Sequence, residues 1–220
     1  MIEKVRIATG LDGAASATGE VVVFDVLRAF TTAAHALDAG LAEIDVVASV
    51  EDAFARPGFR FGEVGGRLVP GFDHDNSPSR LVGKKLSGPG VLRTTSGARG
   101  VVAATRATGL WAASLVVASA TARALAGAVQ VTLVAMGAPD EPAEEEDLAA
   151  AEVVRAMLLG ERPDFERAVA TIRASRAAAR HDGSDPHRPI EDVDRACQTD
   201  AFDFAMKVDR VGSRLVLRKS

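Results

Sequence analysis

The chain has 220 residues, of which 47% are hydrophobic and 25% are charged, so it can bury a sizeable core. This composition excludes a disordered chain and a fibre. The net charge is -4 and no long Lys/Arg run is present, which disfavours nucleic-acid binding. No window reaches the ~18 consecutive apolar residues of a membrane span. The charged start MIEKVRIATG lacks a signal-peptide core, and the single Cys197 excludes an internal disulfide, so we expect a cytoplasmic protein.

Short β-branched runs alternate with Ala-rich stretches of helical period, the order typical of α/β folds. Strands are predicted at 21–24, 44–47, 91–94, 114–118 and 129–135, and helices at 29–40, 101–108, 120–127, 144–160 and 164–179. The tail is predicted to form a helix and then two strands around the turn at Gly212. We therefore expect one compact domain over 1–220. Its class is α/β in three layers, with a mostly parallel or mixed sheet, helices on both faces and a C-terminal β-hairpin.

Ligands of open α/β sheets bind beyond the carboxyl ends of the strands, where loop N–H groups and helix starts converge. The loops at these places in the sequence carry hydroxyls, glycines, arginines and isolated carboxylates: DVLRAFTT (25–32), GEVGG (62–66), PGFDHDNSP (70–78), TTSGARG (94–100), ASAT (118–121) and MGAPD (136–140). Gly and Ser/Thr let donors approach a small anion, and Arg28 and Arg99 offer planar forks for phosphate oxygens. The loops therefore predict a site for a small phosphorylated acid.

Carboxylates would repel such an anion unless a cation lay among them. Mg²⁺ fits this requirement, because it is held by one or two carboxylates with waters and a phosphate oxygen. The candidates are Asp25, Glu63, Asp73 and Asp147. Each also has a plainer role open to it: Asp25 can cap a helix, Glu63 and Asp73 can stabilise turns, and Asp147 follows Glu144, Glu145 and Glu146 at a helix start, where negative charge suits the dipole.

Several familiar catalytic patterns are missing from the sequence. It has no GxxxxGK[ST] loop and no GxSxG elbow, and Asp25 is followed by Val26 and Leu27 rather than by the DxDx[TV] pattern of haloacid dehalogenase-type phosphatases. None of the 4 His residues has the spacing of a zinc site.

Taken in order, VVVFDVLRAFTT, GEVGG, PGFDHDNSP, LRTTSGAR and the EEEDLAAA helix start resemble the 2-phosphosulfolactate phosphatase family of coenzyme M biosynthesis. The resemblance extends roughly from Val21 to Phe204. It implies an α/β, Mg²⁺-dependent phosphatase that hydrolyses 2-phospho-3-sulfolactate to 3-sulfolactate and phosphate.

The family's motifs assign residues to three groups. The resemblance implies catalytic roles for Asp25, Arg28 and Arg99 and metal binding by Asp25, Glu63, Asp73 and Asp147. It implies substrate contacts for Thr31, Thr32, Asn76, Ser77, Thr94, Thr95, Ser96, Gly97 and Ser119. We also expect a small anionic substrate as partner, no nucleic acid or membrane, and a possible homodimer.

This chain departs from the family's pattern in the second loop, where the common GER is Gly62-Glu63-Val64. The lost guanidinium leaves two alternatives open: a phosphatase of the same chemistry acting on an acid without a sulfonate, or an inactive anion-binding module. Two routes also stay open for the reaction, direct attack by water or a phospho-aspartyl intermediate on Asp25.

Overall fold

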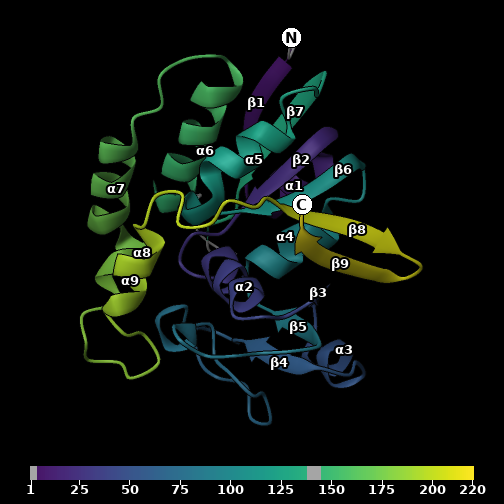
Figure 1. Ribbon diagram of the computed structural model, residues 1–220, viewed down its shortest axis with the longest axis vertical. Coiled ribbons are helices and arrows are strands. Elements are labelled where there is room, and N and C mark those ends of the chain that lie inside the picture. The colour runs from purple at the N-terminus through teal and green to yellow at the C-terminus, as the bar shows by residue number, and fades with distance from the viewer. Residues whose placement is uncertain (1–3, 138–144) are drawn as a thin grey trace.

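The computed structural model describes residues 4–137 and 145–220, which form one nine-stranded sheet with helices around it (Figure 1). The strands are β1 (Lys4–Thr9), β2 (Gly19–Phe24), β3 (Glu43–Val47), β4 (Phe59–Gly62), β5 (Pro89–Arg93), β6 (Ala107–Ala113), β7 (Gln130–Ala135), β8 (Met206–Val211) and β9 (Arg214–Lys219).

The α-helices are α1 (Gly10–Ser16), α2 (Ala29–Asp38), α3 (Val50–Phe54), α4 (Gly97–Ala103), α5 (Ala118–Ala124), α6 (Glu145–Leu158), α7 (Phe165–Ala174), α8 (Arg176–Ala179) and α9 (Glu191–Ala196). Two short 3₁₀ helices, η1 (Ser79–Leu81) and η2 (Leu115–Val117), complete the described elements. None of the helices within the described ranges is long and apolar enough to cross a membrane.

The sheet consists of two parallel groups joined by a hairpin, in the order β1-β7-β2-β6-β8-β9-β3-β5-β4. Strands β1, β7, β2 and β6 are parallel to one another, as are β3, β5 and β4, and the antiparallel pair β8–β9 lies between the two groups. Strands twist by about 20–25° from one neighbour to the next. The twist accumulated across the hairpin turns one group relative to the other, and the loop after β2 meets the loop after β5.

Helices α2 and α4 lie between the two groups of strands, and both contact strands of each group (Figure 1). Helix α6 covers the outer face of β1, β7 and β2, whereas α3 contacts β3 and β5. The predicted α/β class with helices on both faces, a mixed sheet and a C-terminal hairpin is confirmed.

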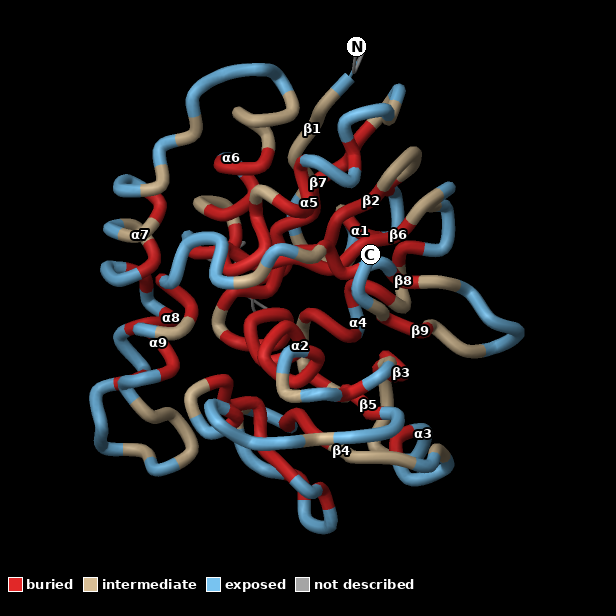
Figure 2. The backbone as a smooth tube through the Cα atoms, viewed as in Figure 1, coloured by how far each residue is buried: buried red, intermediate tan, exposed pale blue. Residues whose placement is uncertain are grey.

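The central position of α2 explains its sequence, AFTTAAHALD: every residue from Ala29 to Leu37 is buried, so the helix is apolar around most of its circumference (Figure 2).

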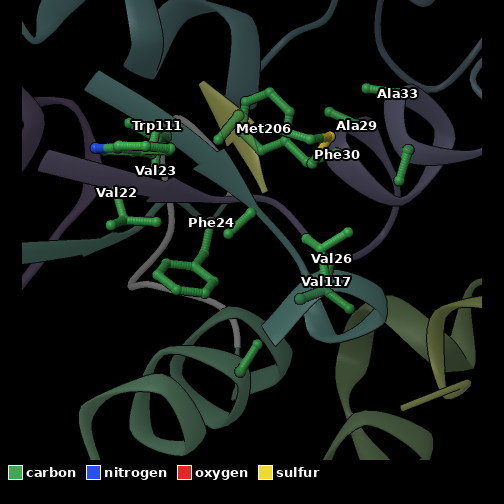
Figure 3. Close-up of a cluster of buried hydrophobic side chains, with 14 of the residues drawn as sticks. Val22, Val23, Phe24, Val26, Ala29, Phe30, Ala33, Trp111, Val117 and Met206 are labelled. Atoms are coloured by element: carbon green, nitrogen blue, oxygen red, sulfur yellow. The ribbon is translucent and has the colours of Figure 1, made fainter. Parts of the chain in front are cut away.

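The largest core cluster joins β2 to α2 across the loop that separates them. Figure 3 shows side chains from β2, from the Val26 position, from α2 and from the start of β8 gathered in one cluster. Phe24 and Phe30 are fully buried in it. Packing on both sides of residues 25–28 therefore fixes the loop in which the sequence places its first candidate site residues.

One predicted element is wrong and two others need adjustment. Residues 114–118 form η2 and the start of α5 rather than a strand, because a short buried apolar run does not reveal its conformation by periodicity. The helix predicted at 101–108 begins at Gly97 and ends at Ala103, and Ala107 already belongs to β6. The predicted 164–179 helix is broken at Ser175, whose hydroxyl accepts the Ala178 N–H at 3.1 Å and starts α8. Helix α6 is described from Glu145, so Glu144 and positions 138–140 of the MGAPD loop lie outside the described residues.

Candidate active site

The loops after β2, β4 and β5 meet at one place with the start of α6. Asp25 follows β2, Glu63 follows β4, Gly97 opens α4 after β5, and Asp147 lies in the first turn of α6. Their side chains or backbone groups are linked by the hydrogen bonds and charge interactions described below. This is the convergence of strand ends that the sequence predicts.

Asp25 lies between two helix starts and receives a backbone N–H on each carboxylate oxygen. Oδ1 accepts the Ala29 N–H at 2.9 Å, and Oδ2 accepts the Gly97 N–H at 2.8 Å. Burial raises the pKa of Asp25 to about 6, and the charge of Glu63 contributes to the increase, whereas the two N–H groups and Arg28 oppose it. The side chain is 7% exposed and forms no ion pair with any described residue. Asp25 is therefore a carboxylate held in a fixed position, and no cationic side chain among the described residues forms an ion pair with it.

Asp147 is held in the same manner next to it. Its Oδ1 accepts the Val26 N–H at 2.7 Å and its Oδ2 accepts the Gly137 N–H at 3.1 Å. Burial raises the pKa of Asp147 well above its usual range, and the charges of Glu146 and Asp25 raise it further. The carboxylate thus ties the Asp25 loop to the end of β7 and carries like charge close to Asp25.

Glu63 is fixed by the loop that follows β5. Its Oε1 accepts the Thr95 N–H at 2.5 Å, and its Oε2 accepts the Thr95 hydroxyl at 2.9 Å and the Gly66 N–H at 2.6 Å. Arg93 donates through Nη1 to the Glu63 carbonyl at 2.5 Å. The Glu63 side chain is 6% exposed. Glu63 and Thr95 were both predicted from sequence, and the structure brings them into direct contact.

Gly97 is required at its position by the closeness of Asp25. A Cβ at Gly97 would lie 2.7 Å from Asp25 Oδ2, 2.9 Å from Asp25 Cβ and 3.0 Å from Ala29 Cβ. No side chain fits there without moving the carboxylate. The glycine therefore permits the backbone of α4 to approach Asp25 and donate its N–H.

Arg28 forms a buried ion pair with Asp192 of α9. Its Nη1 donates to Asp192 Oδ2 at 2.6 Å and to the His187 carbonyl at 2.8 Å, and the two side chains are 4% and 0% exposed. The guanidinium Nε and Nη2 have no hydrogen-bond partner among the described residues. The Leu27–Arg28 peptide bond is cis. Arg28 thus lies beside Asp25, as predicted, with part of its guanidinium already used by Asp192.

Asp192 also holds the loop that precedes η1. Its Oδ1 accepts the Ser77 hydroxyl at 2.7 Å and, from Ser79, the hydroxyl at 2.6 Å and the N–H at 3.1 Å. Asn76 is 4% exposed, and its buried Oδ1 has no partner in the described parts of the chain. His74 supports the same loop through Nε2, 2.9 Å from the Ser77 carbonyl. Ser77 and Asn76 therefore belong to the same loop cluster as Arg28.

Other predicted residues serve the framework around this cluster. Thr31 and Thr32 are fully buried and donate to the Val26 and Arg28 carbonyls at 2.7 and 2.9 Å, which shapes the start of α2. The Thr94 hydroxyl accepts the Ala98 N–H at 3.0 Å and stabilises the start of α4. Ser96 is half-buried at the N-cap position of α4.

The structure does not bring three predicted residues into the cluster. Asp73 is exposed, and its Oδ2 accepts the Arg60 N–H at 2.8 Å, the turn role that a loop Asp often has. Ser119 donates its hydroxyl to Asp200 at 2.6 Å. Arg99 is exposed on α4 and has no hydrogen bond or ion pair with any described residue. No contact links these three side chains to Asp25 or Glu63.

Three residues of the C-terminal third lie at this site although sequence reasoning missed them. Asp192 is the first. His181 is the second: it is 6% exposed, burial and the nearby Arg28 charge lower its pKa, and its Nε2 has no partner among residues 4–137 and 145–220. The third is Arg188, which lies against Gly66 of the Glu63 loop. The available signals were a carboxylate on the apolar face of a short helix, beside Val193 and Ala196, and a loop, HDGSDPHRP, rich in His and Pro.

Asp25 with Glu63 or Asp147 could hold a Mg²⁺ ion. In the described ranges no group of three or more His, Cys, Asp or Glu side chains is placed so that it could hold a metal ion. Mg²⁺ needs only one or two carboxylates, because waters and a phosphate oxygen complete its shell. Glu63 raises the pKa of Asp25, and Asp25 raises that of Asp147, so the three carboxyl groups repel each other's charge. A bound cation would relieve this repulsion, and the donor set therefore fits Mg²⁺.

Buried carboxylates held by backbone N–H groups, with arginines beside them at the ends of parallel strands, define an α/β enzyme site for an anionic substrate. A profile of the 2-phosphosulpholactate phosphatase family matches residues 9–196. A protein of Bacillus subtilis (strain 168), named Probable 2-phosphosulfolactate phosphatase, is 30% identical over 199 residues, 87% of each chain. Proteins of the same name are 35% identical over 151 residues in Symbiobacterium thermophilum, with 64% of this chain and 65% of that one covered, and 37% over 148 residues in Deinococcus radiodurans, with 63% and 61% covered.

The chain therefore belongs to the 2-phosphosulfolactate phosphatase family, whose members are phosphoric monoester hydrolases. This confirms the resemblance found in the sequence.

Proposed function

We propose that the protein is a Mg²⁺-dependent phosphatase that hydrolyses the phosphate ester of 2-phospho-3-sulfolactate to 3-sulfolactate and phosphate. The family membership supports this reaction. The observation that carries it is Asp25, a buried carboxylate fixed between the N–H groups of Ala29 and Gly97, where the loops of both parallel groups meet. We place the enzyme in the cytoplasm, in coenzyme M biosynthesis, and expect a homodimer.

Asp25 and either Glu63 or Asp147 would hold Mg²⁺. When bound, Mg²⁺ neutralises negative charge on the phosphoryl oxygens, which develops further in the transition state. Asp73 was the fourth candidate, and its exposed position and its bond to Arg60 favour the other three. Backbone N–H groups already orient each of these carboxylates, so little reorganisation is needed when substrate binds.

The chemical step breaks the bond between phosphorus and the ester oxygen, and that oxygen gains a proton to become the hydroxyl of the product. In one route, water forms the new bond to phosphorus and passes its proton to a carboxylate of the site. In the other, Asp25 forms that bond, and water then hydrolyses the acyl phosphate. Rapid quenching of a single turnover with labelled phosphate distinguishes them: label on the protein supports the second route, and its absence supports the first.

Arg28 and Arg99 supply positive charge for the phosphoryl group. Arg28 is buried beside Asp25 and has Nε and Nη2 without partners in the described chain, so these donors can bind phosphate oxygens. Arg99 is exposed in the first turn of α4, two residues after Gly97. Because Arg99 is exposed and unpaired, Arg99→Ala should leave stability within about 0.5 kcal/mol. A loss of kcat/KM in that variant would then report a contact with substrate.

Phosphate release is the measurement that tests the function. We would compare 2-phosphosulfolactate with 2-phospholactate, phosphoglycolate and phosphoglycerate, with Mg²⁺ and with EDTA, and use Asp25→Asn as control. Metal-dependent turnover fastest on the sulfonated ester is the expected result. Faster turnover of an acid without sulfonate would favour the alternative substrate class, which the exposed apolar Val64 beside Glu63 supports. Binding of Mg²⁺ and phosphate without turnover of any ester would favour an inactive anion-binding module.

A further inference from the structure

The segment from His181 to Ile190, here called the 181–190 loop, lies beside the catalytic cluster and is fastened to it. Arg28 donates to the His187 carbonyl at 2.8 Å, and Arg80 donates to the Pro186 carbonyl. Within the loop, the N–H groups of His187 and Arg188 donate to Asp185 at 2.9 Å each. These contacts hold the loop to residues on both the β2 side and the β4 side of the site.

Arg188 extends from this loop onto the backbone that supports Glu63. A Cβ on Gly66 would lie 2.4 Å from Arg188 Nη2 and 3.1 Å from both Cζ and Nε, so the guanidinium packs directly against residue 66. Gly66 itself donates its N–H to Glu63 Oε2 at 2.6 Å. The guanidinium therefore packs against the same residue whose N–H holds the Glu63 carboxylate. The φ of +83° at Gly66 favours glycine there.

The donors of the Arg188 guanidinium are uncommitted. Its closest ion-pair contact within the described residues is 3.9 Å, from Nε to Asp185 Oδ2, and the side chain is 27% exposed. By contrast, Arg28 is paired with Asp192, and Arg93 donates to the Glu63 carbonyl. Arg99 is also unpaired, but it lies on α4 next to Gly97 rather than on the Glu63 loop. Arg188 is thus an accessible guanidinium at the Glu63 side of the site, and its one ion pair within the described residues is the long contact with Asp185.

A phosphorylated acid carries at least one negatively charged group besides the phosphate, and Glu63 would repel such a group where it lies nearby. A planar guanidinium at that place offers paired N–H donors to the oxygens of a carboxylate or a sulfonate. We propose that Arg188 forms a subsite for the acid group of the substrate that is not the phosphate, and that it thereby determines specificity for phosphorylated acids. This inference rests on the proposed phosphatase function.

Steady-state kinetics of Arg188→Gln and Arg188→Lys test the subsite. The substrates are 2-phosphosulfolactate, 2-phospholactate with a carboxylate alone, 2-phosphooxypropane-1-sulfonate with a sulfonate alone, and isopropyl phosphate with no second acid. Loss of a charged hydrogen bond predicts a roughly 10- to 100-fold fall in kcat/KM, mainly through KM, for the acids that use the subsite. Isopropyl phosphate should change less than about threefold, and Arg188→Lys should retain part of the selectivity. Comparison of the two single-acid esters shows whether the subsite takes carboxylate or sulfonate.

Arg67→Gln is the matched control, because Arg67 is exposed in the Glu63 loop against which Arg188 packs, and the substitution removes the same charge. An equal loss on all four esters in Arg188→Gln would overturn the proposal, since Arg188 would then hold the phosphoryl group or the loop. No loss on any of them, or an equal loss in Arg67→Gln, would overturn it as well. If the wild-type protein hydrolysed none of the esters, the proposed function itself would fail. Calorimetry with 3-sulfolactate then tests the subsite without turnover: Asp25→Asn should bind it at least 10-fold more tightly than Asp25→Asn with Arg188→Gln, and equal affinities would contradict the proposal.

Discussion

The site contains two sets of buried carboxylates that are stabilised in different ways. On one side, Asp192 is paired with Arg28 and accepts the hydroxyls of Ser77 and Ser79. On the other side, Asp25 and Asp147 receive only backbone N–H groups, and no described cation contacts either of them. The first set has its charge compensated within the protein, and the second does not.

This difference separates a positioning role from a reactive one. A compensated carboxylate holds its neighbours in place: Asp192 joins Arg28 on the β2 side to Ser77 before η1 and to α9. Burial of an uncompensated carboxylate costs free energy and raises its pKa. A cation that binds beside the carboxylate lowers the pKa again. The pKa of Asp25 at about 6 and the raised pKa of Asp147 follow this pattern. The uncompensated negative charge thus lies on Asp25 and Asp147, the carboxylates that we assign to Mg²⁺ and phosphate.

The largest expected effect is on catalysis, in Asp25→Asn. We expect kcat/KM for the best phosphate ester to fall at least about a thousandfold, because the variant loses the carboxylate that acts on the phosphoryl group. Its free energy of unfolding should change by no more than about 1 kcal/mol, since one lost hydrogen bond is offset by removal of a buried charge. Kinetics and urea unfolding measure the two. Large destabilisation with retained activity would reverse the roles assigned to the two sets.

Asp192→Asn should show the opposite balance. It leaves the buried Arg28 without its carboxylate partner, which costs about 3–5 kcal/mol in comparable buried pairs. We expect urea unfolding to show this loss, together with a smaller fall in kcat than in Asp25→Asn. Arg173→Ala is the control, because it breaks an exposed ion pair with Asp194 on the same helix. Equal stabilities of the two variants would contradict the compensated-pair interpretation.

His35, near the carboxyl end of α2, gives a pH-dependent test of how burial shifts a pKa. Burial lowers the pKa of His35 to about 4, whereas the unfolded side chain titrates near 6.5. Between these values the unfolded chain binds a proton that the folded chain does not, so stability is lost as pH falls from 6.5 to 4. The shift corresponds to at most about 3 kcal/mol. Unfolding curves of wild type and His35→Gln across this range should diverge, and parallel curves would exclude His35 as the source.

The smallest expected effect concerns Gly97. The Cβ of Gly97→Ala would lie 2.7 Å from Asp25 Oδ2, so either the carboxylate or the α4 start must move, at a cost of about 1–3 kcal/mol. Activity should fall as well, because the N–H that fixes Asp25 moves. Gly127→Ala is the matched control: an added Cβ there meets nothing within 4 Å. If both variants behave like wild type, the close approach to Asp25 is not needed for function.

The strands that sequence reasoning found are those with buried β-branched runs. Strand β2 and strand β7 lie inside the sheet and are apolar on both faces, so their patterns are plain. Strands β1, β4 and β6 were missed; β6 lies inside the sheet between β2 and β8, whereas β1 and β4 are the two edges of the sheet. Their sequences, KVRIAT and FRFG, include charged residues that an edge strand can expose to solvent. Exposure therefore hid the two edge strands, whereas β6, with the sequence ATGLWAA, lacks a run of β-branched residues and its start was predicted as the end of a helix.

The site was predictable where its residues lie in strand-end loops of recognisable composition. Asp25, Glu63, Thr95 and Gly97 lie in such loops, and the structure brings them together. Asp192 was not predictable, because its contact with Arg28 joins positions 164 residues apart and EDVDRA resembles an ordinary surface helix. Whether a guanidinium such as Arg99 or Arg188 faces the site depends on the path of the chain in space. No local pattern encodes that path.

The hairpin β8–β9 has a consequence for how the molecule is made. Before residues 206–219 leave the ribosome, the strands β6 and β3 have no partner on their inner sides, and the two parallel groups are separate sheets with open edges. Unpaired edges of this kind favour association between chains. The hairpin joins the two groups into one sheet, and α2 and α4 contact strands of both groups as well. A chain without residues 206–219 would therefore carry every loop of the site, but helices rather than strand pairing would have to hold its two parallel groups together.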